Sequence, residues 1–307
     1  MLSDYIRDCV LLLRTGRLHF LIAGFLLYLI GALFAHRLGA SLDLQVFLTG
    51  YLICGAAHLS VSYSNDYFDR FTDDPGIKTR FSGGSGVLPI HTHLAGAVVL
   101  TALLLSLFSL GTTVLLVLIG FFPAFLIAFV AAGITLGWVY SAPPVRLAGR
   151  GLGEVATMAA FGIFLPGGGY LFTAWTIGLE MLTLIIPFFF LGLFFIVSVE
   201  LPDCTNDSKT GKRTLVVRVG RTRALIIATL GAAATTAVFL VLAAFGPDSG
   251  YFFAAAAFAS VVPLSAGIAA VYSARYRILT IEKITENNMR SLILFSCMVA
   301  GYLLLWS

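Results

Sequence analysis

Two acidic clusters contain the side chains of this chain that are best suited to chemistry. The first runs from Asn65 to Asp73 and the second from Glu200 to Asp207. Each follows a long apolar run, where a carboxylate is costly unless a cation compensates its charge. Clustered oxygen ligands without a nearby pair of Cys or His suit Mg²⁺ or Ca²⁺ better than zinc. We therefore expect the two clusters to bind a divalent metal ion together.

The spacing within each cluster selects the ligand candidates. On a helix, residues three or four positions apart lie on one face, whereas Asp66 turns about 100° away from that face. Because Mg²⁺ usually binds a few carboxylates together with substrate phosphates, a phosphate ligand would bridge the clusters. Acids that only solvate a helix end are the alternative, which two motifs in one apolar chain make weaker. The residues that we expect to bind the metal are Asn65, Asp69, Asp73, Glu200, Asp203 and Asp207.

The composition is that of a membrane protein. Of the 307 residues, 59% are hydrophobic and 11% are charged, whereas a soluble domain has roughly 25% charged residues. The mean hydropathy is +0.97. No basic patch with interleaved aromatic residues is present, so the net charge of +4 does not indicate nucleic-acid binding. We expect one all-helical domain over residues 1–307, embedded in the lipid bilayer.

Nine apolar stretches are long enough to cross a hydrocarbon core of roughly 30 Å as helices. Pro123 lies inside the fourth stretch, so the boundary between the third and the fourth is the least well defined. Residues 166–169, Pro-Gly-Gly-Gly, should bend the fifth. The stretches are residues 18–36, 43–65, 92–111, 115–140, 153–173, 181–202, 222–245, 250–273 and 289–306.

The basic residues orient these spans. With a cytoplasmic N-terminus, all of the 19 Lys and Arg residues except Arg37 fall on the cytoplasmic side, in agreement with the positive-inside rule. Both acidic clusters then lie at the cytoplasmic face, and the C-terminus lies outside. We expect the cell membrane to be the location.

The remaining features are less informative. Residues 1–17 mix apolar and charged side chains and can form a short interfacial helix. The first apolar run is too long for the core of a signal peptide, so we expect it to be retained. The four cysteines have no CxxC spacing and indicate neither a disulfide framework nor a zinc site. Nothing in the sequence indicates an obligate protein partner.

Several positions allow both a substrate-binding and a structural role. Lys78 and Arg80 precede a Gly-rich loop that either contacts a phosphate or forms a flexible turn. His58, on the same helical face as the first cluster, either binds substrate or makes an interhelical hydrogen bond. Glu154 either binds hydroxyl groups of an acceptor or pairs with Arg150.

Three ordered motifs carry a family resemblance. Over roughly residues 15–306, the chain resembles the UbiA superfamily of intramembrane prenyltransferases. The segments that match are Asn-Asp-Tyr-Phe-Asp at residues 65–69 with Asp73, Tyr-Ser-Ala-Pro-Pro-Val-Arg at residues 140–146, and Asp203-x-x-x-Asp207 followed by Gly-Lys-Arg-Thr-Leu at residues 211–215.

The resemblance implies a fold and a reaction. The fold is a helical bundle with a lateral cavity, in which Mg²⁺ held by both Asp motifs binds the diphosphate of a polyprenyl donor. Asp69 and Asp203 then belong to the catalytic metal site. Arg146 and Lys212 would contact the diphosphate. Tyr140 and Ser141 would lie near the reacting carbon.

The same resemblance favours an acceptor class. The Asn-Asp-Tyr-Phe-Asp start, the loop at residues 82–86 and the Gly-Lys-Arg-Thr-Leu segment resemble the branch that prenylates 1,4-dihydroxy-2-naphthoate in menaquinone synthesis. Quinone-pathway members often have Asn-Asn where this chain has Val199 and Glu200, which leaves 4-hydroxybenzoate and glycerophospholipid precursors as alternative acceptors. A cation-coupled secondary transporter is the competing class, because buried acids and broken helices also mark ion pathways.

Overall fold

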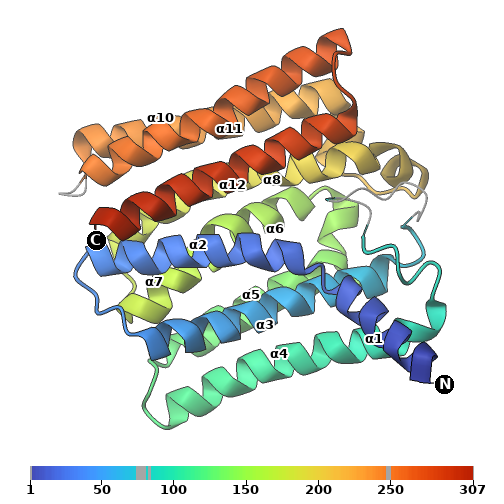
Figure 1. Ribbon diagram of the computed structural model, residues 1–307, viewed down its shortest axis with the longest axis horizontal. Helices are drawn as coiled ribbons and strands as arrows, with labels where there is room; N and C mark the ends of the chain where they lie inside the picture. Colours follow the sequence, from blue (N-terminus) through green and yellow to red (C-terminus); the bar gives the residue numbers. More distant parts are fainter. Residues whose placement is uncertain (1, 74–80, 82–83, 247–249, 307) are drawn as a thin grey trace.

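The computed structural model describes residues 2–73, 81, 84–246 and 250–306 (Figure 1). Lys78 and Arg80 lie outside these described residues. Within them the chain folds into helices and contains no β-strand, which confirms the predicted all-helical fold. The longer helices lie side by side along the long axis of the molecule (Figure 1).

Eight of the described helical segments are long and apolar enough to cross a membrane, and α5 is a shorter apolar helix. Together these nine segments correspond to the nine expected stretches. The helices are α1 (Leu2–Thr15), α2 (Leu18–Arg37), α3 (Leu44–Asp69), α4 (Ala95–Leu118), α5 (Phe125–Ser141), α6 (Gly153–Ala159), α7 (Pro166–Ala174), α8 (Leu179–Lys209), α9 (Leu215–Val219), α10 (Arg221–Phe245), α11 (Gly250–Tyr276) and α12 (Ile281–Trp306), with short turns at Thr92–Leu94 (η2), Leu147–Arg150 (η3) and Ala160–Phe164 (η4).

Successive long helices run in opposite directions, so the two acidic motifs meet at one end of the bundle. Helices α3 and α8 both end on the side where the N-terminus lies, and the C-terminus lies on the other side (Figure 1). At that other end, the guanidinium of Arg37 donates a hydrogen bond of 2.6 Å to the carbonyl of Trp306. The one basic residue predicted to lie apart from the others is therefore at the opposite end from the acidic motifs.

The predicted end of the third span and the predicted start of the fourth were wrong. Helix α4 continues to Leu118 and α5 begins at Phe125, so the predicted span at 115–140 starts too early. Pro123 lies in the connection because proline lacks the N–H that a helix interior requires. Helix α8 instead runs through Pro202 to Lys209, so Asp203 is part of the same helix as the apolar span.

The fifth span is broken, but not at its glycines. A π-helical turn at Ala160–Phe164 separates α6 from α7, and Pro166 begins α7. A Cβ atom at Gly169 would lie 1.8 Å from the carbonyl oxygen of Tyr28, and one at Gly31 would lie 1.8 Å from the carbonyl oxygen of Pro166. The glycines therefore allow α7 to pack backbone against backbone on α2.

Helix α1 is amphipathic and exposed. Tyr5, Ile6, Val10 and Leu13 are exposed on it, and Arg7 forms ion pairs with Asp4 and Asp8. The helix that was expected in residues 1–17 is present, and its location at a membrane surface stays a prediction.

Candidate active site

The two acidic motifs face each other across a polar cavity of about 150 Å³. Helix α3 supplies the first motif, helix α8 supplies the second, and the connection between α8 and α9 supplies a lysine. The charged and amide side chains that line this cavity are Arg17, Asn65, Asp66, Asp69, Asp73, Glu200, Asp203, Asn206, Asp207 and Lys212. The structure thus brings all six predicted metal ligands to one cavity.

The ammonium group of Lys212 lies between the two motifs. Its Nζ atom is 3.3 Å from Asp69 Oδ2, 3.8 Å from Asp73 Oδ1 and 3.8 Å from Asp207 Oδ1. The backbone N–H of Lys212 donates to the carbonyl of Asp207 at 2.9 Å, which holds this turn against the end of α8. The Lys212 ammonium therefore links the carboxylates of Asp69 and Asp207, which are more than a hundred residues apart in the sequence.

The electrostatics of this cluster follow from its burial. Burial raises the pKa of Asp73 to about 7, against the opposing effect of Lys212, and Asp69 raises it further. Burial lowers the pKa of Lys212, but the negative charges of Asp69, Asp73 and Asp207 outweigh this effect, so its pKa is raised. The lysine therefore stays charged at neutral pH, and the cluster as a whole attracts cations.

The first motif extends past the end of its helix. Helix α3 ends at Asp69, but the backbone N–H groups of Thr72 and Asp73 both donate to the Asp69 carbonyl, at 2.8 and 2.9 Å. This turn keeps Asp73 beside Asp69, as the helical spacing predicted. Asn206 on α8 donates to the carbonyl of Thr72 at 2.8 Å and so joins the two motifs directly.

Asp66 has a structural role in the same cavity. It is 4% exposed, and its Oδ1 accepts a hydrogen bond of 2.9 Å from the backbone N–H of Ser85. At Gly84, which has φ of +62°, a Cβ atom would lie 2.1 Å from Asp73 Oδ2. This part of the Gly-rich loop therefore packs directly on the carboxylates, and the Ser85 N–H is bound to Asp66.

Arg17 is a site residue that the sequence analysis missed. It has φ of +49° immediately before α2, and its guanidinium donates to the carbonyl of Phe81 at 3.4 Å. Its charge interacts with those of Asp66, Asp73 and Asp203. In the sequence it is one of several basic residues around the first span, and only its position at the cavity distinguishes it.

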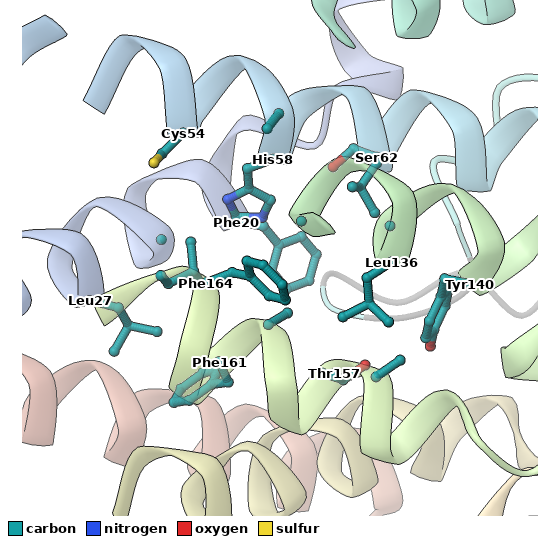
Figure 2. Close-up of a pocket in the computed structure, with 18 of the residues that line it drawn as sticks. Phe20, Leu27, Cys54, His58, Ser62, Leu136, Tyr140, Thr157, Phe161 and Phe164 are labelled. Atoms are coloured by element: carbon teal, nitrogen blue, oxygen red, sulfur yellow. The ribbon is translucent and has the colours of Figure 1, made fainter. Parts of the chain in front are cut away.

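An apolar cavity of about 280 Å³ adjoins the polar one. Figure 2 shows His58 and Ser62 of α3, Phe161 and Phe164 of η4, and Tyr140 of α5 around it. His58 and Ser62 both line this cavity, and a substrate-binding role for His58 stays a prediction. The residues that line both cavities are Arg17, Asn65, Tyr140, Ile196 and Val199.

Among the residues that the structure describes, three buried oxygen atoms in this region have no hydrogen-bond partner. They are Asn65 Oδ1, Ser141 Oγ and Glu200 Oε2. Buried polar atoms are almost always paired, so each of the three requires an explanation. Asn65 and Glu200 line the polar cavity, where a ligand can supply the missing partner. Ser141 is buried beside Tyr140 in the chain but is not among the residues that line either cavity.

Two predicted substrate-binding residues lie elsewhere. Arg146 is exposed in a left-handed conformation, with φ of +46°, and does not line either cavity. Glu154 is 6% exposed, and its carboxylate accepts a hydrogen bond from the backbone N–H of Leu215. Arg150 donates to the carbonyl of Pro144 at 2.7 Å instead of pairing with Glu154.

The residues of the polar cavity can surround a cation. Within the described part of the chain, no three His, Cys, Asp or Glu side chains are arranged to ligate one metal ion by themselves. Three carboxylates do converge within 4 Å of the Lys212 ammonium, and the amide oxygen of Asn65 is buried beside them without a partner. This donor set, made of oxygen atoms only, suits Mg²⁺, which binds a few carboxylates and completes its shell with water and phosphate.

Solved structures share this fold. A UbiA homologue from Archaeoglobus fulgidus bound to GPP and Mg²⁺ is 16% identical, with a TM-score of 0.65 over 94% of this chain and 99% of that one. A UbiA homologue from Aeropyrum pernix K1 is 15% identical, with a TM-score of 0.64 over 93% and 98%. A digeranylgeranylglyceryl phosphate synthase is 14% identical, with a TM-score of 0.62 over 96% and 99%. At these identities the similarity establishes the fold.

A search of curated proteins gave no match. The model of the UbiA prenyltransferase family, in contrast, matches residues 24–290, which include both acidic motifs and every residue that lines the apolar cavity except Arg17, Phe20 and Ala23. The chain therefore belongs to the UbiA prenyltransferase family and is a multi-pass membrane prenyltransferase.

Proposed function

We propose that the protein transfers a polyprenyl group from polyprenyl diphosphate to an aromatic acceptor in menaquinone-type quinone biosynthesis, with Mg²⁺ as cofactor. The observation that carries this proposal is the junction of the two cavities, which share Arg17, Asn65 and Tyr140. A polyprenyl diphosphate has a charged head and an apolar tail, and the joined cavities offer a matching environment for each part.

The diphosphate occupies the polar cavity in this proposal. Lys212 and Arg17 contact the diphosphate oxygens, where negative charge develops as the bond to the prenyl carbon breaks. Mg²⁺ held by the acidic motifs would supply further positive charge to neutralise the charge of the leaving diphosphate. The ligands would come from Asn65, Asp69, Asp73, Asp203 and Asp207. UbiA homologues from Archaeoglobus fulgidus with bound DMAPP or GPP together with Mg²⁺ support this part of the proposal.

The prenyl chain occupies the apolar cavity. Its walls include the rings of Phe20, Phe161 and Phe164, and they exclude water from the allylic cation that forms when the diphosphate leaves. Tyr140 lines both cavities, so its ring lies where the bond breaks and its π face can stabilise positive charge. Arg146 lines neither cavity, and contact of Lys78 or Arg80 with the diphosphate stays a prediction, because both lie outside the described residues.

The acceptor and the orientation are further parts of the proposal. The motif resemblance supports an aromatic acceptor, and the fold of a digeranylgeranylglyceryl phosphate synthase supports a glycerophospholipid precursor as the alternative. We place the acidic motifs at the cytoplasmic face of the cell membrane, with the N-terminus cytoplasmic and the C-terminus outside. The concentration of basic residues at the end of the bundle opposite Arg37 supports this orientation.

An assay of the purified protein tests the proposal. Labelled polyprenyl diphosphate is incubated with 1,4-dihydroxy-2-naphthoate, 4-hydroxybenzoate or a glycerol phosphate acceptor, in Mg²⁺ or in EDTA. We expect a prenylated aromatic product in Mg²⁺ only. Asp69→Asn and Asp203→Asn should each lower turnover by about a hundredfold or more. Asp43→Asn, at the opposite end of α3 where Asp43 accepts a hydrogen bond from Val46, is the matched control.

The same assay separates the alternatives. Product from the glycerol phosphate acceptor alone would assign the protein to the glycerophospholipid branch. A donor that stays intact with every acceptor in Mg²⁺ would contradict the enzyme proposal. Cation flux in proteoliposomes without turnover would then support the transporter.

A further inference from the structure

Within the described part of the chain, one carboxylate oxygen of the buried Glu200 has no hydrogen-bond partner. The residue is 7% exposed, and its Oε2 makes no hydrogen bond. Glu154 offers a direct comparison, because it is 6% exposed and its carboxylate accepts a hydrogen bond from the Leu215 N–H. A buried acceptor without a partner is costly. We therefore expect a bound ligand to supply the hydrogen-bond donor to Glu200 Oε2.

Glu200 is also set apart from the carboxylates that surround Lys212. The ammonium of Lys212 lies within 4 Å of Asp69, Asp73 and Asp207, and Glu200 is not one of these ion-pair partners. On α8, Glu200 lies two turns before Asp207, which places it further from the helix end and nearer the middle of the bundle. The position therefore lies beside the cation cluster and toward the apolar cavity.

The neighbours of Glu200 place it at the junction of the two cavities. Glu200 lines the polar cavity, and the adjacent Val199 lines both cavities. Tyr140, which also lines both cavities, interacts electrostatically with Glu200. This junction is where the diphosphate and the prenyl chain of the donor would meet, and an acceptor must approach it to reach the reacting carbon.

We propose that Glu200 positions the acceptor, by accepting a hydrogen bond from a hydroxyl group of the aromatic ring at the junction of the two cavities. This inference rests on the proposed function. The negative charges of Glu154, Asp207 and Asp203 interact with Glu200, against the single positive charge of Lys212, so these surroundings disfavour a further anionic group. The acceptor therefore presents a neutral hydroxyl to Glu200 and directs any carboxylate elsewhere, which is a specificity role distinct from the metal-ligand role predicted from the helical spacing.

A pair of ring compounds tests the hydrogen bond without turnover. Binding of 1,4-dihydroxynaphthalene and of 1,4-dimethoxynaphthalene to the purified protein is measured by calorimetry, in the absence of donor and Mg²⁺. The methyl ethers cannot donate a hydrogen bond, so the wild-type protein should bind the dihydroxy compound about tenfold more tightly or better. Glu200→Leu should lose this preference, and Glu200→Gln, which keeps an acceptor oxygen and the shape, should retain part of it.

The matched control is Glu154→Gln, since Glu154 is equally buried but already accepts a backbone hydrogen bond. This variant should keep the wild-type preference for the dihydroxy compound and should melt at a lower temperature. A preference that survives in both Glu200 variants would overturn the proposal. The absence of binding of either compound to the wild-type protein would overturn it as well.

Two further measurements distinguish this role of Glu200 from a metal-ligand role and from the proposed function. The Mg²⁺ concentration that gives half-maximal turnover should be unchanged in Glu200→Gln, and a rise of tenfold or more with an intact hydroxyl preference would identify Glu200 as a metal ligand instead. If the wild-type protein shows the hydroxyl preference but makes no product from labelled donor, the proposed function fails while the role of Glu200 in binding stands.

Discussion

The side-chain amide of Asn206 donates a hydrogen bond of 2.8 Å to the backbone carbonyl of Thr72. Asn206 lies on α8 next to Asp207, and Thr72 lies next to Asp73, so this bond fixes the distance between the two acidic motifs. Lys212 adds an electrostatic link between the same two segments. The site is therefore assembled by direct contacts between the motifs, before any substrate binds.

Asn206→Ala should weaken this assembly. The lost hydrogen bond leaves a carbonyl without its partner, and we expect a decrease of about 1 kcal/mol in the free energy of unfolding, together with a higher KM for the donor. Thermal denaturation in detergent and initial rates measure the two effects. Ser208→Ala, at an exposed position on the same helix, is the control. Unchanged donor KM in Asn206→Ala would show that the motifs do not depend on this bond.

The stability of the metal-free protein should depend on the protonation of Asp73. Its pKa rises from 3.8 to about 7 on folding, mainly through burial, so the folded state binds the extra proton between these pH values. Stability therefore decreases as the pH rises from about 4 to about 7 and then levels off. Melting temperatures in EDTA across this range measure the slope. Asp73→Asn should flatten the curve, and Gly111→Ala, which changes no ionisable group, should leave its slope unchanged.

Arg17 should contribute to donor binding and turnover. Arg17→Gln removes the charge that faces Asp66, Asp73 and Asp203 and, in the proposed function, the diphosphate. We expect kcat/KM for the donor to decrease by about tenfold to a hundredfold, because charge stabilisation at a leaving group is a large catalytic effect. Arg14→Gln, an exposed position at the end of α1, is the control. Equal donor kinetics in the two variants would remove Arg17 from the site.

Gly169→Ala should destabilise the bundle. The added Cβ would lie 1.8 Å from the Tyr28 carbonyl oxygen, so α2 and α7 would have to separate, at a cost of about 1–3 kcal/mol. Gly111→Ala is the matched control, since a Cβ there meets nothing within 4 Å and alanine favours a helix interior. Melting temperatures should fall in the first variant and stay level or rise in the second. A Gly169→Ala protein as stable as the wild type would contradict this packing.

The sequence predicted the parts of the site that depend on local spacing. Asn65, Asp69 and Asp73 line one cavity because helical spacing continues through the turn after α3. Asp203 and Asp207 do so because α8 continues through Pro202. Hydropathy located the spans for the same reason, since a membrane helix satisfies its backbone hydrogen bonds within its own segment.

The parts of the site that could not be predicted from the sequence depend on contacts between distant segments. Asp66 lies off the predicted helical face, and the return of the chain at Ser85 supplies a hydrogen-bond donor to it. The motif at residues 140–146 favoured Arg146 as the diphosphate contact and gave no reason to select Arg17, but the fold places Arg17 at the cavity and leaves Arg146 exposed. The error at the start of α5 has a local cause, because the connection after Leu118 is itself apolar and hydropathy does not register its turn.

The glycine contact between α2 and α7 also limits how a substrate can travel. Where Gly31 and Gly169 bring the two backbones together, there is no room even for a single Cβ atom, so a hydrocarbon tail cannot slip between these helices. A polyprenyl chain that enters from the bilayer must therefore pass between another pair of helices. The contact between α2 and α7 closes that side of the bundle.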